Sequence, residues 1–113
     1  MAGSFEHHNP DTTTRLVRSY LRGRNLEQLG RADDAVPLYE AAVASAFDST
    51  GPYDRLIHIY SSAARHSDVR RVCDAALLNI HTHGEKRAWY ERMRAEADRA
   101  EHSVPRAAPR RRE

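Results

Sequence analysis

Cysteine, glycine, proline and lysine are all scarce in this chain of 113 residues. Its single cysteine, Cys73, leaves no possibility of an internal disulfide. With five glycines and five prolines, the chain lacks the frequent turns of a small β-sheet protein, and its few β-branched residues do not alternate with polar ones. These shortages favour helices, and we expect one small all-α domain with a modest core.

Long apolar runs and catalytic motifs are also missing. No stretch approaches the ~20 apolar residues that a membrane-spanning helix needs. Residues 1–11 lack both the basic region and the apolar run of a signal peptide, and we expect a cytoplasmic protein. Because the sequence contains no G-x-S-x-G, P-loop, G-x-G-x-x-G or H-E-x-x-H pattern, we also expect that it is not an enzyme.

Candidate nucleophiles and metal ligands are few. Cys73 lies among apolar residues at helical spacing, which indicates a buried core thiol rather than a nucleophile. Two pairs of histidines stand out, His7 with His8 and His81 with His83. A zinc site needs three or four converging ligands, which neither pair supplies. We interpret these histidines as solvated loop residues and expect no metal and no cofactor.

Positive charge is concentrated near one end of the chain. Of 18 basic residues only Lys86 is a lysine, and the formal net charge is +2. Residues 103–113 carry four arginines against one glutamate, whereas the charges of residues 1–11 are acidic. We expect both segments to be disordered, on either side of a helical domain at 12–102. An arginine-rich tail can attract nucleic acid or an anionic membrane weakly and nonspecifically.

Two helices are expected in the first half of that domain. The first should begin among residues 11–14, whose side-chain oxygens can cap a helix, and run to about residue 29. Gly30 can end it by adopting a left-handed conformation. The second should begin at Asp33 or Asp34, because a carboxylate suits a helix N-terminus. Gly23, in the middle of the first helix, indicates close packing against another helix.

Three more helices are expected in the second half. Pro52 suits the first position of the third helix, with Thr50 or Gly51 as its cap. Ser67 or Asp68 should cap the fourth, and the fifth should run over residues 85–102. Apolar side chains recur at helical spacing along all five helices and predict the core. They are Leu16, Val17, Tyr20, Leu21, Leu26, Leu29, Ala35, Leu38, Tyr39, Ala42, Val43, Phe47, Tyr53, Leu56, Ile57, Tyr60, Ala64, Val69, Val72, Cys73, Ala76, Leu77, Ile80, Trp89, Met93, Ala97 and Ala100.

The sequence matches itself when it is shifted by 34 residues. The shift places Arg31 on Arg65 and Asp34 on Asp68, and it places small and large apolar residues on residues of similar size. A fixed period of this length, built from two helices, is typical of stacked α-helical repeats. The fold class predicted is therefore a short array of antiparallel helix-turn-helix repeats with five helices.

Small and large residues recur at matching places in the two units, at Gly23, Leu26, Gly30, Ala35, Tyr39 and Ala42 in the first and at Tyr53, Leu56, Tyr60, Val69, Cys73 and Ala76 in the second. In this pattern the two units resemble the tetratricopeptide repeat family. Together they cover residues 19–81, and the fifth helix resembles the solvating helix that closes such arrays. The sequence departs from the family pattern at Ser19, Arg22 and Ile57, and Phe47 and His81 replace the usual closing proline. Another short helical bundle is the alternative fold.

The resemblance implies a concave groove lined by the first helix of each unit. Such a mixture of aromatic, charged and hydroxyl side chains suits an extended peptide or a helix. It lacks the lysine and asparagine pattern that clamps a terminal carboxylate in chaperone-binding members of the family. The alternative is that these residues only solvate a small domain. The implied lining residues are Val17, Tyr20, Arg24, Glu27, Gln28, Asp54, His58, Ser61, Ser62 and Arg92.

These expectations favour a non-catalytic protein–protein interaction module, a scaffold or adaptor that binds a peptide or a partner protein. Because solenoids usually need about three repeats for stability, two repeats and a cap should self-associate or require a partner. Two alternatives remain open. One is an accessory nucleic-acid-binding protein that uses the basic tail, and the other is a regulatory subunit of an enzyme.

Overall fold

The computed structural model describes residues 10–81 and 84–103, and all the regular structure in these ranges is helical. The prediction of an all-α fold with five helices is confirmed. None of these helices is long and apolar enough to cross a membrane. Pro10, Asp11 and Ser103, which we expected to belong to disordered terminal segments, are helical instead. The rest of those two segments lies outside the described residues. The helices are α1 (Pro10–Gln28), α2 (Ala32–Ala44), α3 (Thr50–Ser62), α4 (His66–Asn79) and α5 (Lys86–Ser103).

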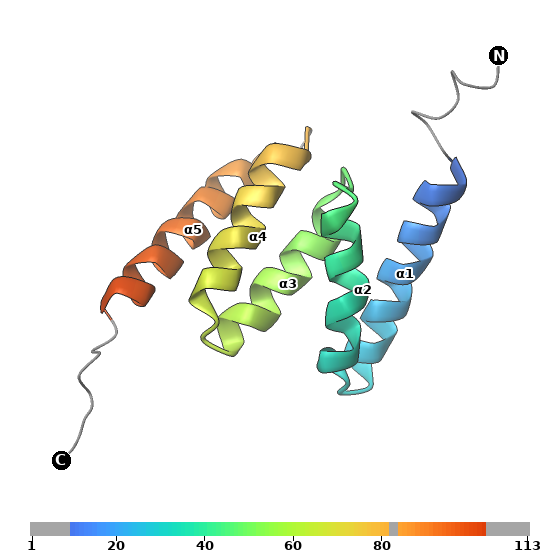
Figure 1. Ribbon diagram of the computed structural model, residues 1–113, viewed down its shortest axis with the longest axis horizontal. Helices are drawn as coiled ribbons and strands as arrows, with labels where there is room; N and C mark the ends of the chain where they lie inside the picture. Colours follow the sequence, from blue (N-terminus) through green and yellow to red (C-terminus); the bar gives the residue numbers. More distant parts are fainter. Residues whose placement is uncertain (1–9, 82–83, 104–113) are drawn as a thin grey trace.

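The helices are arranged side by side in chain order (Figure 1). Each helix packs on the next one along the chain, and α2 also touches α4. Because short turns join them, successive helices run in opposite directions (Figure 1). This packing of neighbours is consistent with a helical repeat array.

The turn between α1 and α2 recurs between α3 and α4, one period later in the sequence. Arg31 and Arg65 occupy the N-cap positions of α2 and α4. Each arginine forms an ion pair with the aspartate three residues further on, at 2.8 Å for Arg31–Asp34 and 2.6 Å for Arg65–Asp68. The backbone N–H of each arginine also donates to the carbonyl five residues earlier. The period is thus reproduced in detail at both turns.

Left-handed residues close three of the helices. Gly30 has φ of +77°, as expected for a residue that ends α1. Alanine occupies the same position after α2 and α3, where Ala46 has φ of +55° and Ala64 has φ of +57°. A left-handed conformation is strained for alanine because its Cβ approaches the following carbonyl oxygen. The prediction that Ala64 belongs to the core is wrong, since it is exposed in this turn.

Three helices begin differently from the prediction. The helices α2 and α4 begin at Ala32 and His66, and no side chain caps either of them. The aspartates that we expected to cap them, Asp34 and Asp68, lie in the first turn and bind the preceding arginine instead. The N-cap of α3 is Ser49 rather than Thr50 or Gly51.

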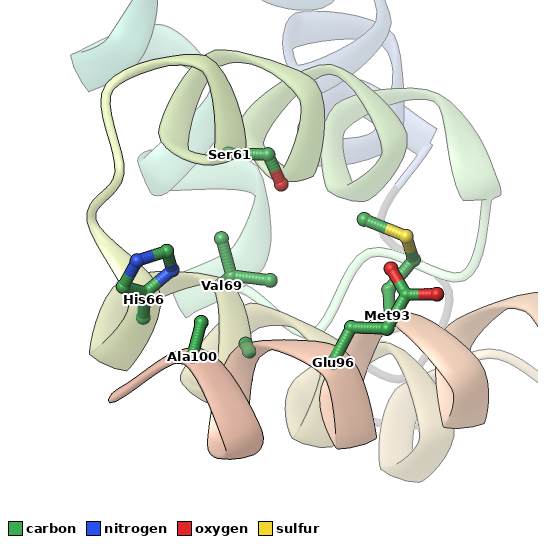
Figure 2. Close-up of a pocket in the computed structure, with 7 residues that line it drawn as sticks. Ser61, His66, Val69, Met93, Glu96 and Ala100 are labelled. Carbon is green, nitrogen blue, oxygen red and sulfur yellow. The ribbon is translucent and has the colours of Figure 1, made fainter. Parts of the chain in front are cut away.

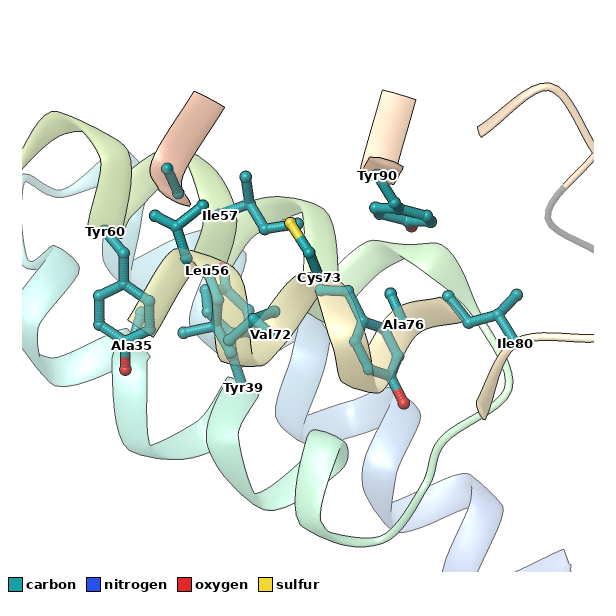
Figure 3. Packing of buried hydrophobic residues seen from close by; sticks show 13 residues of the cluster. Ala35, Tyr39, Leu56, Ile57, Tyr60, Val72, Cys73, Ala76, Ile80 and Tyr90 are labelled. Atoms are coloured by element: carbon teal, nitrogen blue, oxygen red, sulfur yellow. The ribbon is translucent and has the colours of Figure 1, made fainter. Parts of the chain in front are cut away.

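The core runs through the contacts of α2, α3, α4 and α5 (Figure 3). Most of the predicted core residues belong to it. Val17, Leu21 and Leu29 do not, with 39%, 54% and 71% of their surface exposed, because α1 has a neighbouring helix on one side only. Tyr90 was not predicted and is fully buried, while Trp89 beside it is only partly buried. The buried apolar residues of the cluster are Ala35, Tyr39, Tyr53, Leu56, Ile57, Tyr60, Val69, Val72, Cys73, Ala76, Ile80, Tyr90 and Ala97.

Two glycines allow α1 to approach its neighbours. A Cβ on Gly23 would lie 2.6 Å from the Cε1 atom of Tyr39 in α2, which confirms the close-packing role expected for this glycine. A Cβ on Gly51 would lie 2.7 Å from the ring of Tyr20, where α1 meets α3. Both distances are shorter than any normal carbon–carbon contact.

Buried tyrosines, carboxylates and cations join the helices at three places. The Tyr39 hydroxyl donates to Glu27, which also accepts from Arg55, so that one carboxylate connects α1, α2 and α3. At the second place Tyr60 of α3 donates to Glu40 of α2, which accepts two bonds from Arg71 of α4. These are charge-assisted hydrogen bonds, the stronger class in proteins.

The third joint connects α3 and α5. The hydroxyl of Tyr90 lies 2.7 Å from Oδ1 of Asp54, and Nζ of Lys86 lies 2.9 Å from Oδ2 of the same side chain. Burial, and then the bond to Asp54, raises the pKa of Tyr90. Both Tyr90 and Lys86 come from α5, so this joint holds the last helix in place.

Substituting Ala64 by glycine should stabilise the protein by about 1 kcal/mol, because glycine adopts the left-handed conformation without strain. Urea unfolding followed by circular dichroism measures the difference. The matched control is Gly30→Ala one period earlier, which should lower the stability by a similar amount. If Ala64→Gly were neutral or destabilising, the strain assigned to this turn would be refuted.

Substituting Gly23 by alanine should destabilise the protein by about 1–2 kcal/mol, even though alanine is the better helix former by ~1 kcal/mol. The added methyl group meets the ring of Tyr39, which is fully buried and is held by Glu27. Thermal unfolding checks the sign.

The control is Gly51→Ala, which should cost less because it meets the far end of Tyr20, a partly buried ring that can move. An equal or larger loss at Gly51 would contradict this account of the α1–α2 contact.

Candidate functional site

The predicted groove residues lie on α1, α3 and α5, and two of the joints connect these helices. Glu27 ties α1 to α3 through Arg55, and Asp54 ties α3 to α5 through Lys86 and Tyr90. Most of the predicted residues belong to two surface cavities or to the contacts beside them. The helix α1 carries Val17, Tyr20, Arg24, Glu27 and Gln28, α3 carries Asp54, His58, Ser61 and Ser62, and α5 carries Arg92.

Glu27 is the most strongly held of these side chains. Its Oε1 accepts from the Tyr39 hydroxyl at 2.6 Å and from Arg55 Nε at 2.9 Å, and its Oε2 accepts from Arg55 Nη2 at 2.7 Å. Only 12% of the side chain is exposed. The Arg55 hydrogen bonds lower the pKa of Glu27, and they outweigh the opposing effect of burial. Both oxygens are therefore committed to protein donors, and Glu27 positions the surface around it.

A cavity of about 380 Å³ opens beside this ion pair, between the end of α1, the start of α2 and the second half of α3. It brings together three of the predicted groove residues, Glu27, His58 and Ser62. Asp33 also lines it and forms no ion pair with another described residue. Apolar contact is available at Ile59, Ala32 and Ala63. The lining residues are Glu27, Ala32, Asp33, Arg55, His58, Ile59, Ser62 and Ala63.

His58 links this cavity to an aromatic cluster on α5. Its ring lies 5.6 Å from the ring of Trp89, centroid to centroid, and Trp89 lies 5.4 Å from Tyr90. The ammonium group of Lys86 sits 4.6 Å from the centre of the Trp89 ring while it also binds Asp54. The predicted residues Asp54 and His58 thus lie in one contact between α3 and α5.

Tyr20 and Arg24 form the other end of the predicted surface. Nη1 of Arg24 donates to the Tyr20 hydroxyl at 3.2 Å, and the Tyr20 ring lies 5.9 Å from the ring of Tyr39. Gly51 leaves the space that this ring occupies. No carboxylate of the described chain forms an ion pair with Arg24, so its charge is available to a ligand.

Ser61 lines a second cavity, of about 220 Å³, between the end of α3, the start of α4 and α5 (Figure 2). Its floor is apolar, with Val69 and Met93 among the lining residues, and Glu96 and His66 add polar groups at its edge. Ser61 is therefore separated from Ser62, which lines the larger cavity.

The three remaining predicted residues are exposed and line neither of these cavities. Val17 is 39% exposed on α1, and Gln28 is the last residue of that helix. Arg92 lies on the outer surface of α5 and has no hydrogen-bond or ionic partner among the residues that the structure describes. The structure does not bring these three side chains into contact with the rest.

Sequence reasoning missed Arg55, Asp33 and Trp89. For Arg55, the spacing between residues of opposite charge is a signal in the sequence that could have found it. Glu27 and Arg55 are 28 residues apart, and Glu40 and Arg71 are 31 apart, which is close to one repeat. In a stacked array such residues lie on neighbouring units, so a search for opposite charges at about this spacing would have found both pairs.

The described residues contain no group of three histidine, cysteine, aspartate or glutamate side chains that could hold a metal ion. Cys73 is buried in the core, as predicted, and burial raises the pKa of its thiol to about 12. It is thus a protonated thiol at neutral pH and a poor nucleophile. His81 is exposed, while His7, His8 and His83 lie outside the residues that can be described.

Comparison of the chain with protein-family models, with curated protein sequences and with solved structures found no match.

Replacing Glu27 by glutamine should make the free energy of unfolding depend less on pH at acidic pH. The folded state lowers the pKa of Glu27 below the ordinary value of 4.5, so its contribution is complete above that pH and is lost as pH falls through the folded-state value. At neutral pH the substitution should cost about 1–2 kcal/mol, because Arg55 loses a charged partner.

Urea midpoints measured from neutral pH to below 4.5 test this expectation. The control is Glu85→Gln, because Glu85 is exposed and has no ionic partner among the described residues. If both variants kept the wild-type slope, the Glu27 bond would contribute nothing to folding.

Proposed function

We propose that this chain is a non-catalytic interaction module, a short array resembling tetratricopeptide repeats that binds a peptide or a partner protein on the α1–α3–α5 surface. The observation that carries this proposal is the cavity of about 380 Å³ beside the Glu27–Arg55 pair. Three residues implied by the resemblance, Glu27, His58 and Ser62, line it together. Its volume is at the lower end of the range of ligand pockets, which suits a side chain of a bound peptide.

The chemistry of the surface supports a peptide ligand. Asp33 offers a carboxylate without an ionic partner among the described residues, and Ser62 and His58 offer hydrogen-bonding groups. Arg24 supplies a cation further along α1, next to the aromatic ring of Tyr20. Charged and polar groups around a small apolar floor recognise an extended peptide through its side chains as well as its backbone.

The rigidity of this surface also favours binding. The carboxylates of Glu27 and Asp54 hold the helices in register through tyrosine and cation partners. A surface that is already ordered loses little conformational entropy when a ligand binds. Because these carboxylates and the Cys73 thiol are committed to the fold, the same facts support a binding role over catalysis.

Selection of extended peptides from a displayed library tests the proposal. Peptides that bind the wild-type protein should lose about tenfold or more in affinity for Arg24→Glu, because the substitution reverses the accessible charge of this surface. The melting temperature should fall only slightly. Arg24 makes one hydrogen bond, to a partly buried tyrosine, and its charge is the smallest of the causes that lower the pKa of Glu27 one turn away.

The matched control is Arg22→Glu, two residues away and therefore on the opposite face of α1. Selected peptides should bind this variant as tightly as the wild type. If no peptide were enriched, or if both variants lost affinity equally, the α1–α3–α5 surface would not be the binding site.

A further inference from the structure

The outer face of α1 carries a row of arginines that have no acidic partners among the described residues. Arg15, Arg18 and Arg22 follow one another at spacings of three and four residues, so they lie along one face of the helix. All three are exposed. Arg15 donates only to Thr12, at 3.5 Å, and neither Arg18 nor Arg22 has an ionic partner among the described residues. Elsewhere in the described chain, most arginines are bound to carboxylates.

The repeat period allows this face of α1 to be compared with the equivalent face of α3, which lies in the interior of the array. Shifting by one period places Arg18 on Pro52 and Arg22 on Leu56 in α3. Both of these residues are buried. Leu56 belongs to the core cluster together with Tyr39 of α2, the helix that packs on α3 (Figure 3). A helix therefore covers this face one repeat later, whereas α1 presents arginines at the equivalent positions.

The apolar neighbours of the arginines favour a protein helix over a polyanion. Leu21, which is 54% exposed, lies beside the row, one turn from Arg18, and Leu29 lies at the end of the row with 71% exposed. Phosphate backbones are bound mainly by charge and hydrogen bonds, without exposed leucines. A helix with carboxylates next to leucines matches both features, because arginine binds carboxylates in a bidentate manner and the leucines lose contact with water.

A second copy of the chain does not supply such a helix at its opposite end. The outer face of α5 presents Arg92 and Arg99, which are exposed and have no ionic partner in the described ranges, and the exposed carboxylate of Glu91 on this face is already paired with Arg87. Stacking α5 of one copy on α1 of another would bring cations against cations, which is unfavourable. Charge complementarity thus favours a different, acidic protein.

We infer that the outer face of α1, formed by Arg15, Arg18, Arg22 and Leu21, with Leu29 at its end, is a docking site for an acidic amphipathic helix of a partner protein. That helix occupies the place that α2 takes on α3. The site is separate from the α1–α3–α5 surface, so the inference does not depend on the peptide-binding role proposed above.

Two designed amphipathic peptides of about five helical turns, identical except for glutamate or lysine at their charged positions, provide the test. Binding to the full chain is measured by fluorescence anisotropy. The glutamate peptide should bind and the lysine peptide should not. The double variant R18E/R22E should lose about tenfold or more in affinity for the glutamate peptide and gain affinity for the lysine peptide, with an unchanged melting temperature.

Two control variants locate the site. Arg99→Glu, on α5, and Arg24→Glu, on the other face of α1, should both keep wild-type affinity for the glutamate peptide. If R24E no longer binds the peptides selected on the α1–α3–α5 surface but still binds the glutamate peptide, the two sites are separate. Leu21→Ala should lower the affinity for the glutamate peptide about threefold or more. Attraction between charges alone would not be affected by this substitution.

Several outcomes would overturn the inference. They are failure of the glutamate peptide to bind, an equal loss of affinity in Arg99→Glu, and an unchanged affinity in Leu21→Ala. Tighter binding of duplex DNA than of the glutamate peptide would identify the face as a nucleic-acid site. A dimer in light scattering that R18E/R22E dissociates would identify the occupant as a second copy.

Discussion

The helices of this protein are held in register by a carboxylate that accepts a hydrogen bond from a buried tyrosine and also binds a cation. The arrangement occurs three times, around Glu27, Glu40 and Asp54. In the first two cases the three groups come from three different helices. Apolar packing alone would let neighbouring helices slide, because the hydrophobic effect has little directional preference. The polar joints select one register, and the close contact at Gly23 lets Tyr39 reach the first of them.

These joints combine two opposing electrostatic effects. At Glu40, burial raises the pKa and is the largest single effect, yet the bonds from Arg71 and Tyr60 together lower it below its usual value. Burial and the Glu40 bond raise the pKa of Tyr60 to about 12. The acid is thus held ionised and the phenol protonated over a wide pH range. Stability should decline below about 4.5, where the glutamates take up protons, and above about 10, where the unfolded tyrosines lose theirs.

The helices and the core could be predicted from the sequence because both follow from local periodicity. The helix starts were less accurate, since Asp34 and Asp68 have two possible partners, the backbone N–H groups and a nearby arginine. Tyr90 escaped prediction because its neighbour Trp89 is more apolar and the burial of Tyr90 depends on Asp54, far away in the chain. The predicted groove residues fall on the expected helices, but the engagement of Glu27 by Arg55 required knowledge of how the units stack.

The spacing of the joints has a consequence for how this chain can change in length. The loops α1–α2 and α2–α3 lie between Glu27 and Arg55 in the sequence. The loops α2–α3 and α3–α4 lie between Glu40 and Arg71. One residue added within a helix between two partners would rotate the later partner by about 100° around its axis. Sequence drift in this protein should therefore proceed by substitution along the helices, while insertions are confined to loops that can bulge without turning a helix.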